Sequence, residues 1–221
     1  MAAPAWTLVV PVKRLALAKT RLTALAGERR PALALAFALD TVAACLDCPA
    51  AGHVVVVTDE AGVRDAAEEL GAVVVADRPD SGLNPALVHG AESARPGDSV
   101  AAVSADLPAL TPAVLARVLE LAAPHPVSFL ADAAGSGTTV YAALSAADFA
   151  PAYGRGSAAG HRDAGAVPLD GTGLAAARRD VDTPEDLAAA VALGVGPRTR
   201  QVLREIRPDL AQHVADVRSP G

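Results

Sequence analysis

Lysine is nearly missing from this chain: of its 19 lysines and arginines, only Lys13 and Lys19 are lysines. Both lie in one stretch, VVPVKRLALAKTRL, where the first apolar run ends. A lysine carries a compact charge on a flexible stem, whereas arginine presents a rigid planar fork. The clustering of the two lysines therefore raises the question of which group they contact.

Aromatic residues are also scarce, at 3% of a chain of 221 residues that is 52% hydrophobic. The core must therefore consist mainly of Ala, Val and Leu, and the length suits one α/β domain with a small extension. The net charge of −6 argues against non-specific binding to nucleic acid or to a membrane surface. An anionic ligand would need a local cluster of cations, and KRLALAKTR is the candidate.

Long apolar runs and additional cysteines are missing as well. No uncharged run approaches the roughly 20 residues of a membrane-spanning helix. The apolar run at 7–12 is too short for a secretory signal, and its basic residues follow it, so we expect a cytoplasmic protein. Cys45 and Cys48 form an isolated C-x-x-C without the second pair that zinc would need. A redox pair is conceivable, but we interpret them as buried structural thiols.

Short β-branched runs alternate with helical patterns along the chain. We predict strands at 7–12, 53–58, 72–75, 99–104, 127–131 and 138–143, and helices at 31–46, 61–70, 85–94, 112–122 and 184–193. This alternation predicts an α/β fold, a Rossmann-like, mostly parallel sheet with helices on both faces. We expect one domain over 1–195 and a helical extension over 196–221, with an amphipathic helix at 198–217.

Two familiar phosphate-binding loops do not occur: G-x-x-x-x-G-K-[ST], and G-x-G-x-x-G after a strand. A P-loop ATPase and an ordinary dinucleotide-dependent dehydrogenase are therefore disfavoured. In open α/β sheets, ligands bind beyond the carboxyl ends of the strands. Lys13, Lys19 and Arg21 follow the first predicted strand, and together they can match the charge of a polyphosphate. An ordinary solvated loop is the alternative.

Carboxylates follow the same edge of the predicted sheet. Asp106, in SADLPAL, comes after the strand at 99–104, and Asp180 and Asp182, in RRDVDTPEDL, precede a helix. Magnesium takes one or two carboxylates together with substrate phosphates, and residues two apart in an extended segment share a face. Alternatively, Asp106 belongs to a turn and Asp182 to the helix start, where Thr183 is the expected N-cap.

Two glycine-rich segments place hydroxyl groups near strand and helix ends. GSGTTVYAA carries Thr139 at the start of a strand, and YGRGSAAGH carries Gly154 and Ser157 before a helix. Glycine lets backbone approach an anion, and hydroxyls bind it, although two plain turns are the alternative. We interpret His161 as a surface residue or a neighbour of the site, and not as a nucleophile.

The segment DSGLN contains Asn84, the only asparagine of the chain, beside Ser81 and Gly82. An Asn side chain and free backbone can read the edge of a nucleotide base. A turn accounts for the same residues.

In this order, the motifs resemble the guanylyltransferases of deazaflavin coenzyme F-420 biosynthesis, a branch of the nucleotidyltransferase fold. The resemblance extends from residue 8 to about residue 193 and rests on VPVKRLALAKTRL, DSGLNPAL, SADLPAL, GSGTT, GRGSAAGH and DVDTPEDL. The related molybdenum-cofactor branch would show a GGxSxRMG loop after its first strand. The VKRLALAKTRL found here favours the F-420 branch.

The resemblance implies transfer of GMP from GTP to phosphoenolpyruvate, forming enolpyruvyl-diphospho-guanosine and pyrophosphate. It implies that Thr139, Gly154 and Ser157 bind phosphoenolpyruvate and that Asp106 and Asp182, or Asp180 of that pair, bind Mg²⁺. Alternatives are 2-phospho-L-lactate as acceptor, a nucleotidyltransferase with a pterin or sugar-phosphate acceptor, and a non-catalytic nucleotide-binding module. We expect no nucleic-acid or membrane partner, and a possible hand-over of product to a downstream transferase of the pathway.

Overall fold

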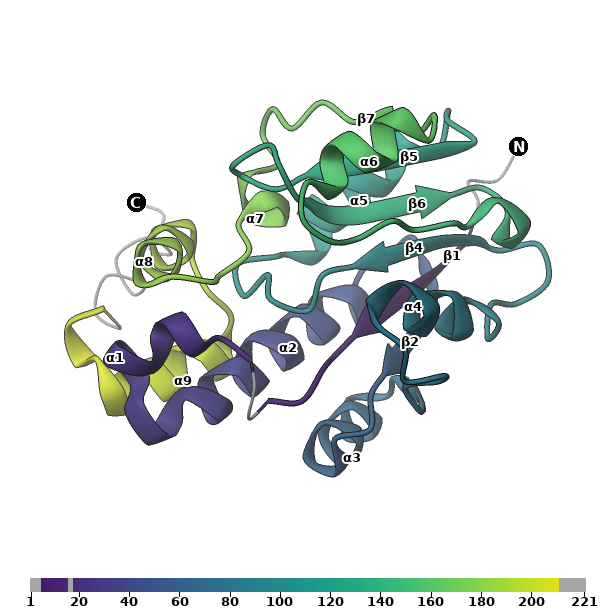
Figure 1. The fold of residues 1–221 in the computed structure, drawn as a ribbon. Coiled ribbons are helices and arrows are strands. Elements are labelled where there is room, and N and C mark those ends of the chain that lie inside the picture. Colours follow the sequence, from purple (N-terminus) through teal and green to yellow (C-terminus); the bar gives the residue numbers. More distant parts are fainter. Residues whose placement is uncertain (1–4, 16–17, 211–221) are drawn as a thin grey trace.

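The computed structural model describes residues 5–15 and 18–210, and its strands form a seven-stranded sheet in the order β3-β2-β1-β4-β6-β5-β7 (Figure 1). The strands are β1 (Trp6–Pro11), β2 (Ala51–Val57), β3 (Val73–Val75), β4 (Ser99–Val103), β5 (Val127–Ala131), β6 (Thr138–Ala143) and β7 (Val167–Pro168). β6 runs antiparallel to β4 and β5, whereas the other neighbouring pairs are parallel. The prediction of a mostly parallel sheet is confirmed.

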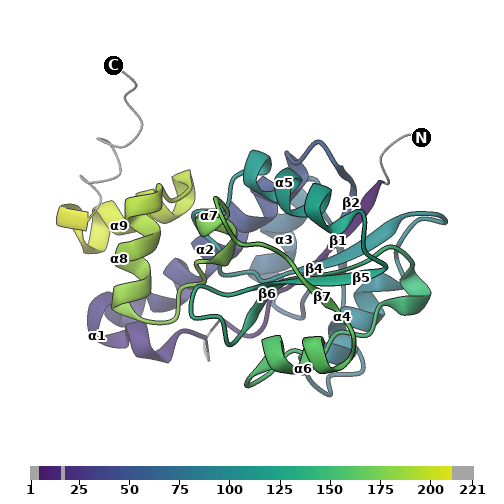
Figure 2. The same cartoon turned by 90° about the horizontal axis from the view of Figure 1, so that it is seen from above.

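Helices cover both faces of this sheet, as predicted (Figure 2). The α-helices are α1 (Thr23–Ala26), α2 (Arg30–Leu46), α3 (Ala61–Leu70), α4 (Leu83–Ala91), α5 (Pro112–Ala122), α6 (Ser157–Asp163), α7 (Ala175–Arg178), α8 (Pro184–Leu193) and α9 (Pro197–Ile206). Short 3-10 turns are η1 (Thr20–Leu22), η2 (Gly27–Arg29) and η3 (Ala146–Asp148). α2, α3, α5 and α7 pack on one face, and α4 and α6 pack on the other.

Most elements fall where the hydrophobic pattern predicts them. The predicted bounds of β5, β6, α3, α5 and α8 are those of the structure. α4 begins at Leu83 and ends at Ala91, so Asn84 lies in its first turn instead of in a preceding loop. β7 and α7 were not predicted, because two and four residues are too short to show a period. The predicted helix at 198–217 is too long: α9 ends at Ile206, before Pro208, and residues 211–217 lie outside the described residues.

The core is built from small aliphatic side chains, as the composition predicts. Successive residues of β1 alternate between the two faces: Leu8 and Val10 lie in one cluster, and Val9 lies in the other. Cys45 and Cys48 are unpaired and buried, and burial raises the pKa of both thiols, so they stay protonated. The prediction that both thiols are buried is confirmed. Among the described helices, none is long and apolar enough to cross a bilayer.

α9 is fastened to the domain by a buried carboxylate of α2. Asp40 is only 5% exposed and accepts hydrogen bonds from the backbone N–H groups of Arg198 (3.1 Å) and Thr199 (2.8 Å). These are free N–H groups of the first turn of α9, where a negative charge also faces the positive end of the helix dipole. Leu203 of α9 shares a hydrophobic cluster with Phe37 of α2. Residues 197–206 therefore pack against α2.

We expect Asp40→Ala to lower the free energy of unfolding by about 1–3 kcal/mol, because two buried N–H groups lose their acceptor. Urea denaturation followed by circular dichroism measures the change. Asp47→Ala is the matched control, since Asp47 is exposed just after the same helix, and we expect it to change stability by less than about 0.5 kcal/mol. Equal effects of the two substitutions would contradict this account of α9.

Candidate active site

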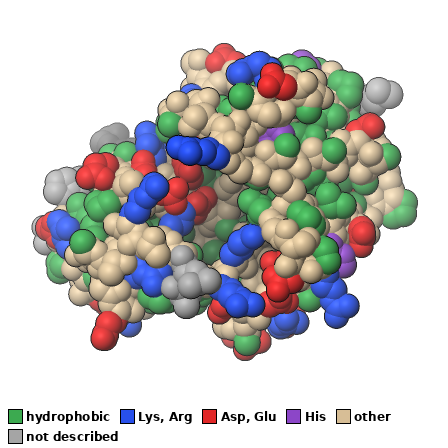
Figure 3. Space-filling model, in the orientation of Figure 1, with side chains coloured by type: hydrophobic (Ala, Val, Ile, Leu, Met, Phe, Trp, Pro, Cys, Tyr) green, Lys and Arg blue, Asp and Glu red, His purple; other side chains and the backbone are tan. Residues whose placement is uncertain are grey.

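Three loops meet at the carboxyl edge of the sheet through the side chain of Lys19. Its ammonium donates to Oδ2 of Asp106, which follows β4, and to Oδ1 of Asp182, which precedes α8, at 2.7 Å. The Lys19 side chain is only 12% exposed, whereas that of Asp182 is 53% exposed. Figure 3 shows a hollow between the α1–α8–α9 helices and the sheet, with acidic and basic side chains around it. The structure thus brings together three residues that the sequence analysis singled out.

The loop that delivers Lys19 has an unusual backbone. Lys19 adopts left-handed angles (φ 56°, ψ 39°) immediately before η1, a conformation that is costly for a residue other than glycine. The Arg30 guanidinium of α2 donates a hydrogen bond to the carbonyl of Ala18, the residue before Lys19, and so ties the loop to α2. The strained position is maintained by contacts on both sides of Lys19.

Backbone contacts join the two acidic loops to each other. The N–H of Val181, between Asp180 and Asp182, donates to the carbonyl of Asp106 at 3.1 Å. Asp186 of α8 accepts from the N–H groups of Thr183 (3.0 Å) and Asp182 (3.3 Å) in a capping box. The predicted N-cap at Thr183 is confirmed, and Asp182 both precedes this cap and contacts Lys19.

Negative charge exceeds positive charge among these groups. Burial and the neighbouring carboxylates of Asp106, Asp132 and Asp182 raise the pKa of Asp180 to about 7. Burial lowers the pKa of Lys19, but Asp106 and Asp182 outweigh it and raise that pKa above its ordinary value, so the amine stays charged. In the part of the chain that the structure describes, no three acidic, His or Cys side chains form a ready-made metal site.

Asp132 belongs to this region, although we did not predict it as a site residue. Its carboxylate accepts from the N–H groups of Ser136 and Gly137, both at 2.9 Å, and closes the β5–β6 turn. A Cβ at Gly137 would lie 2.5 Å from the carboxylate, so this position requires glycine. Arg178 donates to the Asp132 carbonyl at 2.7 Å. An Asp three residues before a Gly-Ser-Gly segment is the sequence signal that could have found this turn.

The predicted acceptor-binding residues lie on the antiparallel side of the same edge. Thr139 is buried near the start of β6, and its carbonyl accepts from the N–H of Ser104 at 2.8 Å, two residues before Asp106. Ser157 is buried and begins α6, and Gly154 has φ 146°, which glycine favours. The N–H of Ala158 donates to the Ser136 carbonyl at 3.2 Å, so the start of α6 is tied to the β5–β6 turn.

Asn84 makes hydrogen bonds to the backbone of Tyr153 that could not be predicted from the sequence. Its side-chain amide donates to the Tyr153 carbonyl at 3.0 Å and accepts from the Tyr153 N–H at 2.7 Å. Asn84 therefore positions the segment that leads to Gly154, and a role in binding the nucleotide stays a prediction. Ser81 is exposed, and Gly82, with φ 122°, directly precedes α4.

Of the two alternatives given for His161, a surface residue or a neighbour of the site, the first is wrong, because its side chain is completely buried. Nε2 accepts from the N–H of Ala152 at 2.8 Å, so Nδ1 carries the proton and donates to the Thr138 hydroxyl at 2.9 Å. The ring stacks on Tyr141 at a centroid distance of 4.5 Å. Burial lowers the pKa of His161 to about 4. The neutral ring packs from α6 against Phe129 of β5 and Tyr141 of β6, consistent with the view that it is no nucleophile.

Cavities border the lysine loop, the segment after β1 that carries Lys13 and Lys19. Lys13, Lys19 and Asp106 line one of about 220 Å³ between the ends of β1 and β4. A neighbouring cavity of about 520 Å³ shares Lys13 and also borders Asp77. Arg21 is exposed on η1.

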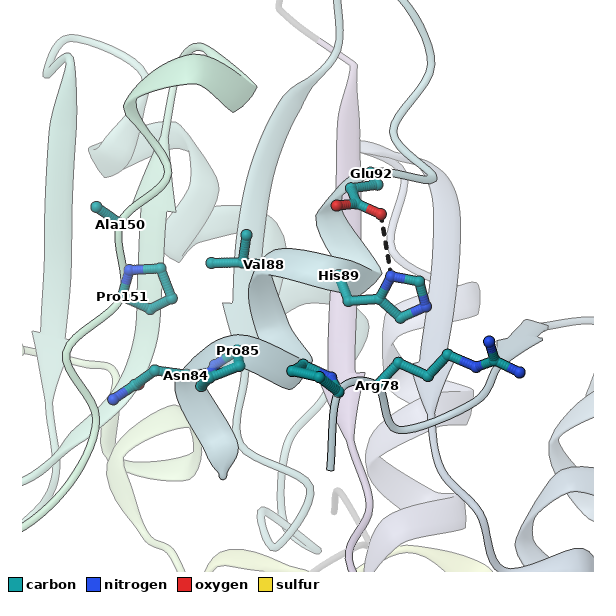
Figure 4. A pocket seen from close by; sticks show the side chains of 9 residues that line it. Arg78, Asn84, Pro85, Val88, His89, Glu92, Ala150 and Pro151 are labelled. Carbon is teal, nitrogen blue, oxygen red and sulfur yellow. Dashed lines mark hydrogen bonds and ion pairs between the residues drawn. The ribbon is translucent and has the colours of Figure 1, made fainter. Parts of the chain in front are cut away.

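A larger, mostly apolar cavity of about 680 Å³ lies beside α4 and includes Asn84 among its walls (Figure 4). On its far side, the ring of His89 contacts the Glu92 carboxylate at 3.0 Å. None of the predicted charged site residues lines this cavity.

Known proteins resemble this chain in sequence and in fold. A family model described as "Guanylyl transferase CofC like" matches residues 6–218. The phosphoenolpyruvate guanylyltransferase of Thermomonospora curvata is 57% identical over 197 residues, covering 88% of this chain and 86% of the relative. The protein of the same name from Streptomyces coelicolor is 56% identical over 201 residues, covering 89% and 95%.

Solved structures show the same fold at much lower identity. A nucleotidyl transferase from Methanothermobacter aligns with a TM-score of 0.59 at 18% identity, covering 92% of this chain and 100% of that one. A 4-diphosphocytidyl-2C-methyl-D-erythritol synthase aligns with a TM-score of 0.58 at 14% identity, covering 86% and 99%. The chain therefore has the nucleotidyltransferase fold.

The buried imidazole gives the fold a defined pH dependence. Because the pKa of His161 is about 4 in the folded state and about 6.5 when unfolded, acid favours the unfolded state between these values. The stability that this group contributes above about pH 6.5 should fall towards pH 4, by about 2.5 kcal/mol at pH 4.5. Urea denaturation of the wild type and of His161→Gln at pH 7.5 and 4.5 isolates this contribution.

We expect His161→Gln to lose less stability than the wild type on acidification. His125→Gln, outside the aromatic cluster around His161, is the control and should follow the wild type. An identical acid loss in the wild type and in His161→Gln would contradict the buried neutral imidazole.

Proposed function

The chain belongs to the CofC-like guanylyl transferase family, and on that premise we propose that it transfers GMP from GTP to phosphoenolpyruvate. The products are enolpyruvyl-diphospho-guanosine and pyrophosphate, in coenzyme F-420 biosynthesis. The observation that carries the proposal is the junction of Lys19 with Asp106 and Asp182 at the carboxyl edge of the sheet. The activity named for the relatives supplies the two substrates.

The reaction is an in-line displacement at the α-phosphorus of GTP. A phosphate oxygen of the acceptor forms the new P–O bond, the bond to the bridging oxygen of the β-phosphate breaks, and pyrophosphate leaves with that electron pair. Because the acceptor phosphate is already ionised at neutral pH, no general base is needed. Both reactants are anions, so neutralising their charge is the main task of the protein.

The lysine loop suits the triphosphate. Lys13 is exposed at the end of β1 and lines the same cavity as Lys19, and Arg21 follows on η1. An ammonium has three N–H donors, so Lys19 can hold both carboxylates and still donate to a phosphate oxygen. Ser81, Gly82 and Asn84 lie at the start of α4, and we propose that they border the nucleotide.

We propose that Asp106 and Asp182, with Asp180 beside them, hold Mg²⁺. The donor set fits this ion, since carboxylate oxygens are hard ligands and substrate phosphates complete the coordination. The crowding of carboxylates that raises the pKa of Asp180 also favours a bound cation. When bound, the ion supplies positive charge between the two anionic reactants.

The acceptor then lies against the antiparallel part of the sheet. The hydroxyls of Thr139 and Ser157, with the open backbone at Gly154, suit a small phosphorylated carboxylate. We also propose that the product passes to a downstream transferase of the same pathway.

Magnesium-dependent release of pyrophosphate from GTP tests the proposal. We expect release with phosphoenolpyruvate, and none above background without an acceptor or with ATP or CTP in place of GTP. A parallel reaction with 2-phospho-L-lactate distinguishes the two acceptors of the family. Release only with 2-phospho-L-lactate would correct the acceptor, and silence with both would contradict the guanylyltransferase function.

Asp106→Asn should reduce turnover at least about 100-fold, because the neutral amide no longer pairs with Lys19 or supplies a charged oxygen. Pyrophosphate release gives the rate, and circular dichroism shows whether the fold persists. Asp65→Asn on the exposed side of α3 is the matched control and should turn over like the wild type. Normal turnover in Asp106→Asn would remove Asp106 from the site.

A further inference from the structure

The helix α2 contacts the Asp106 loop through one buried hydroxyl, that of Thr41. Its side chain is completely buried, and Oγ1 accepts a hydrogen bond from the N–H of Leu107 at 3.2 Å. The same oxygen lies 3.3 Å from the carbonyl of Ala105 and 2.9 Å from that of Phe37, one turn earlier in α2. Thr41 therefore contacts the backbone on both sides of Asp106.

The hydrogen bonds of the Thr41 hydroxyl would have no substitute if the hydroxyl were removed. Leu107 is itself completely buried, so without the hydroxyl its N–H could not form a hydrogen bond to water instead. A hydroxyl has a single proton, which it donates to one of the two carbonyls while its lone pair accepts from Leu107. One side chain thus both donates and accepts at the turn that carries Asp106.

Three hydrogen-bonded contacts hold the backbone around Asp106 and so orient its carboxylate. Ser104 bonds to β6 through its N–H, and the Asp106 carbonyl accepts from Val181. Thr41 supplies the third contact, and it alone comes from a long helix, seventeen residues in length. The other two contacts come from the end of a strand and from a loop. The contact with α2 therefore ties the turn to the most rigid of the three elements.

We propose that Thr41 is a positioning residue of the transferase reaction, which sets the orientation of Asp106 towards Lys19 and the reacting phosphates. The proposal rests on the function proposed above. Because Thr41 is completely buried, it would not contact a substrate, and its loss should lower the rate of the chemical step and leave substrate binding nearly unchanged. Misplacement of a reacting group by about 1 Å can cost about 100-fold in rate.

The test compares Thr41→Val, which keeps the shape but removes the hydroxyl, with Thr41→Ser, which keeps the hydroxyl. We expect Thr41→Val to lower kcat at least about tenfold, with KM for GTP and for phosphoenolpyruvate within about twofold of wild type. Thr41→Ser should recover kcat to within about threefold. Rates are measured well below the Tm of each variant.

Thr7→Val is the matched control for the loss of a buried hydroxyl. Thr7 is completely buried near the start of β1, away from the carboxyl edge, and its hydroxyl donates to Asp98 at 2.8 Å. We expect this variant to lower Tm and to leave kcat unchanged. An unchanged kcat in Thr41→Val, an equal loss of kcat in Thr7→Val, or a Thr41→Ser as slow as Thr41→Val would overturn the proposal.

A second readout does not depend on activity. Amide hydrogen exchange at Leu107, measured by NMR, should be at least about tenfold faster in Thr41→Val than in the wild type and in Thr7→Val. Unchanged exchange at Leu107 would overturn the proposal even if the wild type released no pyrophosphate. Silence of the wild type with every acceptor would instead contradict the proposed function, so the two failures are distinguishable.

Discussion

The arrangement of the site depends on one ammonium group held between two carboxylates. Lys19 joins segments that lie 87 and 163 positions away along the chain, and it does so with a backbone conformation that disfavours side chains. A glycine would relieve the backbone but could not supply the charge. The contacts of the Lys19 ammonium with Asp106 and Asp182 therefore require a charged side chain at this strained position.

Around this junction, hydrogen bonds from side chains to the backbone hold the loops of the site in place. Asp186 organises the segment before α8, Arg30 holds the lysine loop, and Asn84 fixes the segment before Gly154. Each of these polar side chains bonds to main-chain groups, and Asp186 also accepts from the side chains of Thr183 and Arg179. The charged groups can then face the hollow, while the residues behind them keep the loops rigid.

The sequence predicted the sheet class, the order of most elements and the edge at which polar residues gather, because these follow from hydrophobic periods and from the geometry of parallel strands. It also singled out Lys19, Asp106 and Asp182. It could not show that these three touch, because spacing along a chain gives an order and not a distance. Their roles in binding metal and nucleotide stay predictions.

What the sequence missed has a common physical cause. Asp132 and Asn84 act on backbone groups, and such contacts leave no periodic pattern. His161 stands in a glycine- and serine-rich segment that suggests an exposed turn, yet it fills a gap among aromatic rings. With so few aromatic residues, a buried neutral imidazole serves as one of the larger packing elements, and only the tertiary structure reveals it.

The antiparallel strand β6 brings a separate part of the chain to the edge of the sheet where the site lies. Because β6 runs against β4, it brings its first residues to the edge where β1 and β4 bring their last ones. Two kinds of segment thus border one hollow, and they belong to different supersecondary units. On the proposed assignment of the acceptor to the β5–β6 hairpin and α6, and of the nucleotide to the β1–β3 half, substitutions that change the acceptor and substitutions that change the nucleotide would fall in different segments of the chain.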